Sequence, residues 1–108
     1  MEDRFKKIVK INGKKFQFEI AIEEASEFIQ AVQKYKRGKG TLKHVLEEMA
    51  DTLVTFSCLV EALQDEELYS TPQDIIAQFM VEKTDWVENY DQKNDKPVTW
   101  QNFKSTGS

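Results

Sequence analysis

The sequence is poor in cysteine, proline and glycine, and each shortage excludes a class of protein. The single cysteine, Cys58, cannot form an intrachain disulfide and leaves too few thiolates for a structural zinc site. Two prolines and four glycines are few for 108 residues, and with 40% hydrophobic residues they favour a helix-rich globular domain. No apolar run approaches the roughly 20 residues that span a bilayer, and the N-terminus lacks the apolar core of a signal peptide. We therefore expect a soluble, cytoplasmic protein with no membrane partner.

The chain also lacks an excess of positive charge. It carries 15 basic and 19 acidic residues, for a formal net charge of -4. A surface with this balance repels a phosphate backbone, because nucleic-acid binding is driven by clustered cations. Duplex nucleic acid is therefore excluded as an expected partner.

Three segments show the periodicity of amphipathic helices, with apolar residues recurring three and four positions apart. We predict helices over 17–35, over 42–63 and from Thr71 to about Tyr90, the last beginning with an N-cap threonine and a first-turn proline. The second segment is apolar nearly all round, so it must be covered on several sides. The stripes are Phe18, Ile22, Ala25, Ile29 and Val32 in the first segment and Leu42, Leu46, Met49, Leu53, Phe56, Val60 and Leu63 in the second.

These segments predict an all-α fold, an antiparallel helical bundle. Around Asn12-Gly13, which suits a tight turn, residues 1–16 allow a short hairpin or an irregular arm. The helical domain is expected over 17–92 and a polar tail over 93–108. Because three helices of this kind do not cover their own core, we expect a homodimer or homotetramer.

Two pairs of carboxylates stand out, each three residues apart and so on one helix face: Glu24 with Glu27, and Glu48 with Asp51. A solvated acidic face is the simple explanation, since glutamate is common on surfaces. However, Asp51 and Glu48 lie on sides of the helix that become apolar one or two turns later, where unneutralised carboxylates are unfavourable. A hard divalent cation such as Mg²⁺ would neutralise them. Iron or manganese centres on paired helices usually add a histidine at the third position, and none is there.

The order and spacing of the acids resemble the EExxE…ExxD signature of the MazG-like all-α nucleotide pyrophosphohydrolases. The first half is Glu23-Glu24-Ala25-Ser26-Glu27 and the second is Glu47-Glu48-Met49-Ala50-Asp51. Gln17, the stretch Lys34 to Gly38, and Lys83 also resemble small, often phage-encoded members. The resemblance covers roughly residues 17–90.

This resemblance implies an enzyme that splits a (deoxy)nucleoside triphosphate into the monophosphate and pyrophosphate with Mg²⁺, for which Mn²⁺ can substitute. Carried over by position, the metal ligands are Glu24, Glu27, Glu48 and Asp51. Glu23 and Glu47 follow as accessory acids, and any one of the six carboxylates could orient the attacking water. Bound Mg²⁺ neutralises phosphate charge and lowers the pKa of a coordinated water, so no protein nucleophile is required.

Several cations are candidate phosphate contacts. Lys83 occupies a helix position at which the pattern would normally place an apolar residue. As an alternative to a phosphate contact, its aliphatic chain could lie along the apolar surface while its ammonium reaches solvent. Related proteins commonly carry an arginine shortly after this lysine, and Thr84 to Asn89 contain none. Lys34, Lys36 and Arg37 could take that role, although positive charge near a helix C-terminus is also favoured by the helix dipole.

The remaining candidates each have a structural alternative. Trp86, Tyr90 and Trp100 could stack on a base, but aromatic residues more often belong to a core or interface. Gln17 could bind a base or phosphate or be an ordinary surface residue. We expect His44 to be a surface histidine with no acid placed to orient it, and Cys58 to be buried and inert.

Two other functions remain open from the sequence. A protein with the same fold and metal site could bind a nucleotide or alarmone without hydrolysing it, and the missing arginine supports this alternative. The chain could also be a structural helical interaction module whose acids only form a solvated face.

Overall fold

The computed structural model describes residues 1–90, so Trp100 and the predicted tail over 93–108 lie outside the described residues. Within residues 1–90 the structure contains α-helices and no strand, which confirms the all-α class. The helices are α1 (Glu2–Asn12), α2 (Lys14–Lys36), α3 (Leu42–Ala62) and α4 (Pro72–Glu88).

The chain divides into two compact units, Met1–Glu67 and Leu68–Ser108. The first contains α1, α2 and α3, and the second contains α4. The α4 helix begins as its sequence predicts: the hydroxyl of Thr71 accepts a hydrogen bond from the backbone N–H of Asp74 at 3.3 Å, and Pro72 occupies the first turn. Among residues 1–90, no helix combines the length and the apolar character that a membrane crossing requires.

The N-terminal hairpin or irregular arm is a wrong prediction, because the segment forms helix α1. Its half-buried residues Phe5, Ile8 and Val9 are spaced three and four apart, which is helical rather than alternating spacing. Gly13 does turn the chain, but with φ of 86° it ends α1, and its N–H donates to the carbonyl of Val9 at 2.7 Å. The glycine that suits a hairpin serves equally as a helix terminator.

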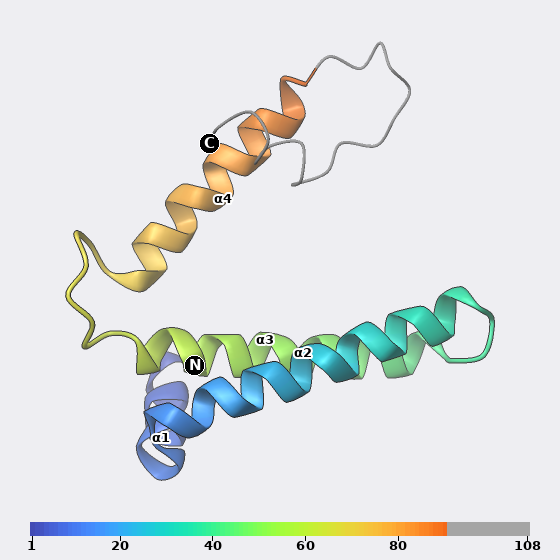
Figure 1. Ribbon diagram of the computed structural model, residues 1–108, viewed down its shortest axis with the longest axis horizontal. Helices are drawn as coiled ribbons and strands as arrows, with labels where there is room; N and C mark the ends of the chain where they lie inside the picture. The colour runs from blue at the N-terminus through green and yellow to red at the C-terminus, as the bar shows by residue number, and fades with distance from the viewer. Residues whose placement is uncertain (91–108) are drawn as a thin grey trace. The chain divides into compact units, whose positions relative to one another are not determined.

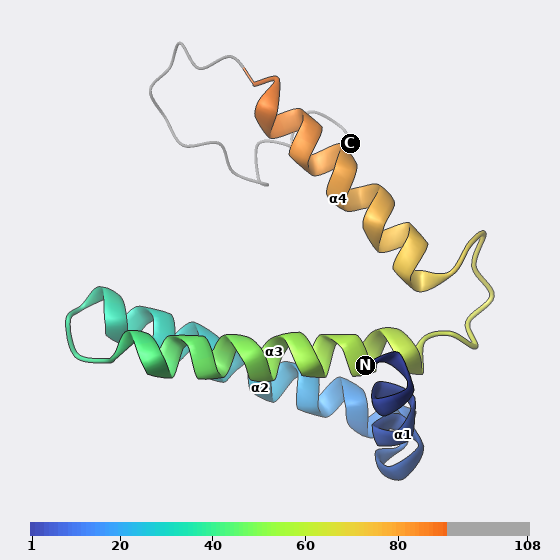
Figure 2. The same cartoon turned by 180° about the vertical axis from the view of Figure 1, so that it is seen from behind.

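Helices α2 and α3 form an antiparallel pair, and α1 packs across the end where α2 begins and α3 finishes (Figures 1 and 2). The tight connection between α2 and α3 uses Gly38, with φ of 77°. The carbonyl of Lys34 accepts N–H groups from Arg37, Lys39 and Gly40, at 3.2, 2.9 and 3.2 Å. These bonds satisfy a carbonyl that the end of a helix would otherwise leave unpaired.

Most of the buried residues on α2 and α3 are small. Ala21 and Ala31 are buried on α2, and Thr52, Thr55, Cys58 and Ala62 are buried on α3. Small side chains allow two helix backbones to approach closely, toward the short end of the ordinary interaxial range of about 8–10 Å. The burial of Cys58 agrees with the sequence prediction, and burial raises the pKa of its thiol.

A large apolar stripe on each of these helices remains exposed. At 100° per residue, Phe18, Ile22 and Ile29 lie on the side of α2 opposite Glu27. In the same way, Leu46 lies on the side of α3 opposite Glu48. The exposed residues of the two stripes are Phe18, Ile22, Ile29, Val32, Leu42, Leu46, Met49, Leu53 and Phe56.

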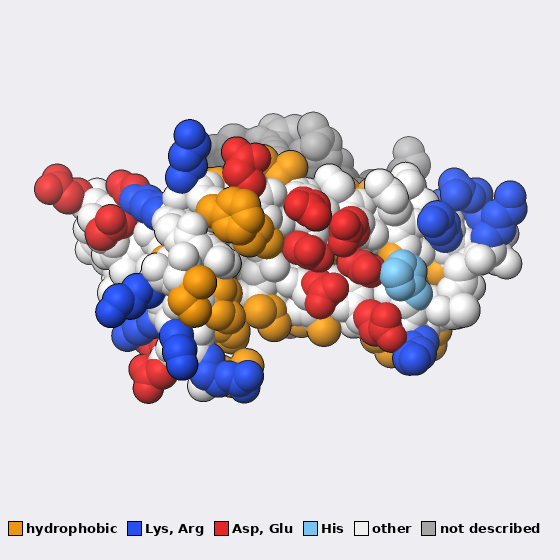
Figure 3. Space-filling model, turned by 90° about the horizontal axis from the view of Figure 1, so that it is seen from below, with side chains coloured by type: hydrophobic (Ala, Val, Ile, Leu, Met, Phe, Trp, Pro, Cys, Tyr) orange, Lys and Arg blue, Asp and Glu red, His pale blue; other side chains and the backbone are white. Residues whose placement is uncertain are grey.

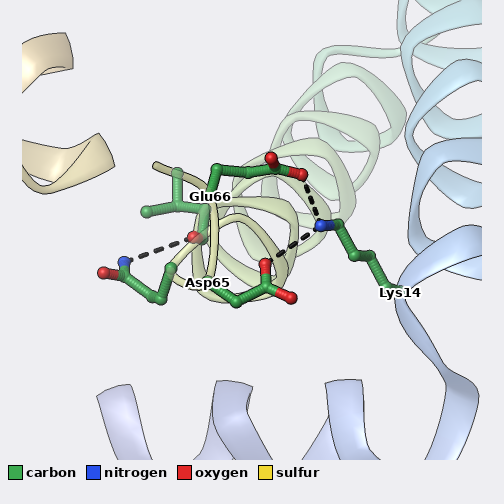
Figure 4. Close-up of polar contacts among 5 residues, drawn as sticks. Lys14, Asp65 and Glu66 are labelled. Carbon is green, nitrogen blue, oxygen red and sulfur yellow. Dashed lines mark hydrogen bonds and ion pairs between the residues drawn. The ribbon is translucent and has the colours of Figure 1, made fainter. Parts of the chain in front are cut away.

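An ion-pair cluster joins the first turn of α2 to the segment that follows α3 (Figure 4). The ammonium of Lys14 lies 3.0 Å from Oδ1 of Asp65 and 2.5 Å from Oε1 of Glu66. Hydrogen bonds to Glu66 and then Asp65 raise the pKa of Lys14, and the bond from Lys14 lowers the pKa of Asp65. The cluster therefore ties the beginning of α2 to the end of α3.

Candidate metal centre

Three of the predicted carboxylates come together between α2 and α3. Oxygen atoms of Glu24, Glu27 and Glu48 all lie within 4.8 Å of one another. Glu24 and Glu27 are neighbours because three residues make nearly one helical turn, whereas Glu48 reaches them from the antiparallel partner helix. Acidic side chains gather on this face of the molecule, over the middle of the α2–α3 pair (Figure 3).

Buried Thr52 fixes the two helices next to each other at the level of the acids. Its hydroxyl donates to the carbonyl oxygen of Glu48 at 2.8 Å, on its own helix, and lies 3.4 Å from the carbonyl oxygen of Glu24 on α2. A side chain much larger than threonine would hold these backbones apart. The distance between Glu24 and Glu48 therefore depends on this small residue.

Two carboxylate oxygens of the cluster are buried without a hydrogen-bond partner: Oε2 of Glu24 and Oε2 of Glu48. A buried acceptor with no donor costs free energy, and the cost is larger for a charged group. Oxygen atoms of this kind are the ligands that hard divalent cations prefer. The orphaned atoms therefore fit a cation site, which a solvated acidic face would not produce.

The electrostatics of Glu24 agree with this geometry. Burial raises the pKa of its carboxyl group, and the negative charges of Glu27, Asp51, Glu48 and Glu23 raise the same pKa further. Each contribution disfavours the carboxylate form when no cation is bound. A bound cation would reverse the balance by neutralising the charges that crowd Glu24.

The other three predicted acids lie around the cluster rather than in it. Asp51 is exposed and does not belong to the group of three, although its charge acts on Glu24. Glu23 is exposed and also acts on Glu24. Glu47 is exposed and its Oε1 lies 3.6 Å from the ammonium of Lys43, one turn earlier on α3.

The expectation that no acid lies beside His44 is wrong. Its Nε2 lies 3.9 Å from Oε1 of Glu48, one helical turn later. The sequence did contain the signal, because residues four apart on a helix are neighbours. His44 is thus next to a residue of the acidic cluster.

Gln17 is not the surface residue that one alternative expected. It is only 1% exposed, and its amide Nε2 is buried without a hydrogen-bond partner. Gln17 and Glu24 are seven residues apart on α2, which places them on one helix face about 10 Å apart along the axis.

The basic residues predicted to bind substrate lie at two places in the chain. Lys34 is in the last turn of α2 and Arg37 follows it. Lys34 is seven residues beyond Glu27, about 10 Å along the helix axis. Lys83 lies on α4 in the second unit and is half-buried.

Trp86 and Tyr90 also belong to the second unit, where they contact each other. Their ring centroids are 5.1 Å apart with an interplanar angle of 50°. This tilted arrangement is a favourable one for aromatic pairs. Both residues are half-buried.

Comparison with known proteins identifies the family. The sequence model of the MazG nucleotide pyrophosphohydrolase domain matches residues 14–89, most of the chain, and confirms the resemblance inferred from the acidic motifs. No curated protein and no solved structure matches. Helix α1 lies outside the matched segment, whereas all six predicted acids lie inside it. The family is typically metal-dependent, which is consistent with the acidic cluster.

Proposed function

Because the chain belongs to the MazG nucleotide pyrophosphohydrolase family, we propose that it hydrolyses a (deoxy)nucleoside triphosphate to the monophosphate and pyrophosphate in a Mg²⁺-dependent reaction. The observation that carries this proposal is the pair of buried, unpartnered oxygens of Glu24 and Glu48. They belong to residues that, with Glu27, converge from two helices. Such atoms favour a bound divalent cation, and a phosphate-cleaving enzyme of this family would use that cation.

The residues that would hold the cation are Glu24, Glu27 and Glu48, and the exposed Asp51, which lies outside that group of three, is the proposed fourth ligand. Bound Mg²⁺ would neutralise phosphate charge and lower the pKa of a coordinated water. Mn²⁺ should substitute, because it also accepts carboxylate oxygens in octahedral geometry. In the reaction, the oxygen of one water bonds to the α-phosphorus. The bond between the α-phosphorus and the oxygen that bridges it to the β-phosphorus breaks, and pyrophosphate leaves with that bridging oxygen.

The chain itself must orient that water and accept its proton. We assign this task to the carboxylates of the cluster and its edge, with Glu23 and Glu47 as accessory acids. Because Glu24, Glu27 and Glu48 would be occupied by the cation, the exposed acids Glu23 and Glu47 are the ones left to accept the proton of the water. No protein nucleophile takes part in this scheme.

The substrate contacts belong to the same proposal. Lys34 and Arg37 supply positive charge at the end of α2, and Lys83 supplies it from α4. Trp86 and Tyr90 offer aromatic surface to a base, and the unpartnered amide of Gln17 offers a hydrogen-bond donor. The proposed substrate contacts are Gln17, Lys34 and Arg37 in the first unit and, taken separately, Lys83, Trp86 and Tyr90 in the second.

The test is pyrophosphate release from a panel of dNTPs and NTPs, with and without Mg²⁺. We expect metal-dependent release, and we expect Glu48→Gln and Asp51→Asn to reduce it by at least about 100-fold, because each removes a ligand charge from the metal centre. Glu19→Gln, an exposed glutamate on α2, is the matched control.

The outcomes separate the alternatives. Nucleotide binding without pyrophosphate release would favour a protein that sequesters a nucleotide or alarmone. No binding and no metal response would leave a structural helical module. Full activity in Glu48→Gln or Asp51→Asn would refute the assignment of the site.

We further propose that the protein acts as a homodimer or homotetramer in the cytoplasm. Exposed apolar stripes on two adjacent helices form a surface that single soluble chains rarely leave in water. A second copy carries the same surface, and a two-fold axis can bring the two together.

A further inference from the structure

The imidazole of His44 faces one oxygen of a cluster carboxylate while the other oxygen of that carboxylate is buried. His44 lies in the first turn of α3, and its Nε2 is 3.9 Å from Oε1 of Glu48. The side chain of Glu48 is 13% exposed, and its Oε2 is buried without a hydrogen-bond partner. Glu48 therefore has an outer oxygen beside the imidazole and an inner oxygen that has no protein partner.

We propose that His44 is a positioning residue of the metal centre: its imidazole holds the outer oxygen of Glu48, which keeps the inner oxygen available to a cation shared with Glu24 and Glu27. This inference rests on the proposed metal-dependent function. The distance of 3.9 Å exceeds that of a direct hydrogen bond, so the N–H acts through one bridging water or after a small side-chain rotation. Groups that orient metal-binding side chains in this way commonly change metal affinity by about 10–100-fold.

The backbones of both residues are already fixed, which confines the effect to the side chains. The N-cap hydroxyl of Thr41 accepts the N–H of His44 at 3.1 Å. The hydroxyl of Thr52 donates to the carbonyl of Glu48 at 2.8 Å. With its backbone held, the Glu48 side chain still has several rotamers, and restricting it to one costs conformational entropy when no neighbour selects that rotamer. The imidazole provides that neighbour.

The chain contains a matched control one residue earlier. Lys43 and Glu47 have the same four-residue spacing on the same helix, with Nζ and Oε1 3.6 Å apart. That pair is well exposed, with side-chain exposures of 87% and 57%, and Glu47 does not belong to the cluster of three. If the His44–Glu48 pair only stabilised the helix, removing the His44 side chain should affect Mn²⁺ binding no more than removing the Lys43 side chain from the other pair.

The experiment is a calorimetric titration of the full-length protein with Mn²⁺ alone, without nucleotide. We compare the wild type with His44→Leu, His44→Gln and Lys43→Leu, and check helical content by circular dichroism. We expect His44→Leu to weaken Mn²⁺ binding about 10-fold or more. His44→Gln keeps a side-chain N–H of similar reach and should restore most of the affinity, and Lys43→Leu should bind as the wild type does.

Three results would overturn the role of His44. They are wild-type affinity in His44→Leu, equal weakening in His44→Leu and Lys43→Leu, or no recovery in His44→Gln. The Glu48→Gln variant separates this failure from failure of the site itself. If Glu48→Gln abolishes Mn²⁺ binding while His44→Leu does not change it, the metal centre stands and only the positioning role falls. If Glu48→Gln binds as the wild type does, both are wrong.

Discussion

Replacing Glu24 by glutamine should make the metal-free protein more stable and remove its response to Mg²⁺. Burial raises the pKa of Glu24, and the charges of four acidic neighbours raise it further, so its carboxylate is a source of repulsion in the folded state. Like-charge neighbours each destabilise by a few tenths of a kcal/mol, so removing this charge should stabilise the fold by about 1 kcal/mol after allowance for solvent screening. For a domain of this size, that corresponds to a rise of about 4–8 °C in Tm.

The effect should also depend on pH in a defined direction. The pKa of Glu24 is raised in the folded state, so the folded protein holds this proton more tightly than the unfolded chain does. The resulting stability is present below the ordinary glutamate pKa and is lost as the pH rises through the raised value. Glu24→Gln should therefore lack this loss of stability with rising pH. The difference in stability between Glu24→Gln and the wild type should grow as the pH rises from the ordinary glutamate pKa through the raised pKa of Glu24.

Thermal unfolding followed by circular dichroism, with and without Mg²⁺, measures both effects. A cation present at 100 times its Kd stabilises the wild type by about 2.7 kcal/mol, whereas Glu24→Gln should gain little. Glu19→Gln, an exposed residue of the same helix, should change neither property. A less stable metal-free Glu24→Gln, or one that responds to Mg²⁺ as the wild type does, would refute the reasoning.

Two further predictions concern the contacts around the site. Lys14→Met should lower Tm and reduce its dependence on salt, because Lys14 ties the start of α2 to Asp65 and Glu66, and Lys15→Met is the control. Because the pKa of Asp65 is lowered, this stabilisation should be present above the ordinary aspartate pKa and disappear as the pH falls through the lowered value. Leu46→Lys should convert an oligomer to monomers in light-scattering measurements, because a buried lysine at an apolar interface lacks a partner; an unchanged mass would exclude this stripe from the interface.

Much of the acidic cluster could be predicted, because two of its members are brought together by their spacing within one helix. Glu24 and Glu27 share a helix face by spacing alone, and the apolar stripes predicted the bounds of α2 and α3 within a few residues. The approach of Glu48 to Glu24 depends on the register between two helices. That register is set by contacts such as those of Thr52, which no single helix pattern reveals.

The failures have equally specific causes. The Asn12-Gly13 dipeptide fits both a hairpin and the end of a helix, and only the spacing of Phe5, Ile8 and Val9 favours the helix. The acidic neighbour of His44 follows from its four-residue spacing to Glu48, because residues four apart share a helix face. The burial of Gln17 could not be deduced, because a polar residue on a helix face carries no sign of what packs against it.

The small residues between α2 and α3 should make the proposed metal centre sensitive to substitutions at positions that do not bind the cation. Ala21 and Ala31 are buried on either side of Glu24 and Glu27, so a bulkier side chain at either position would push the two helices apart. The oxygen atoms would then spread, which suits the 2.3–2.6 Å bonds of Ca²⁺ better than the 2.0–2.1 Å bonds of Mg²⁺. Selectivity between the two ions would therefore be adjustable from the helix packing, with every liganding carboxylate left in place.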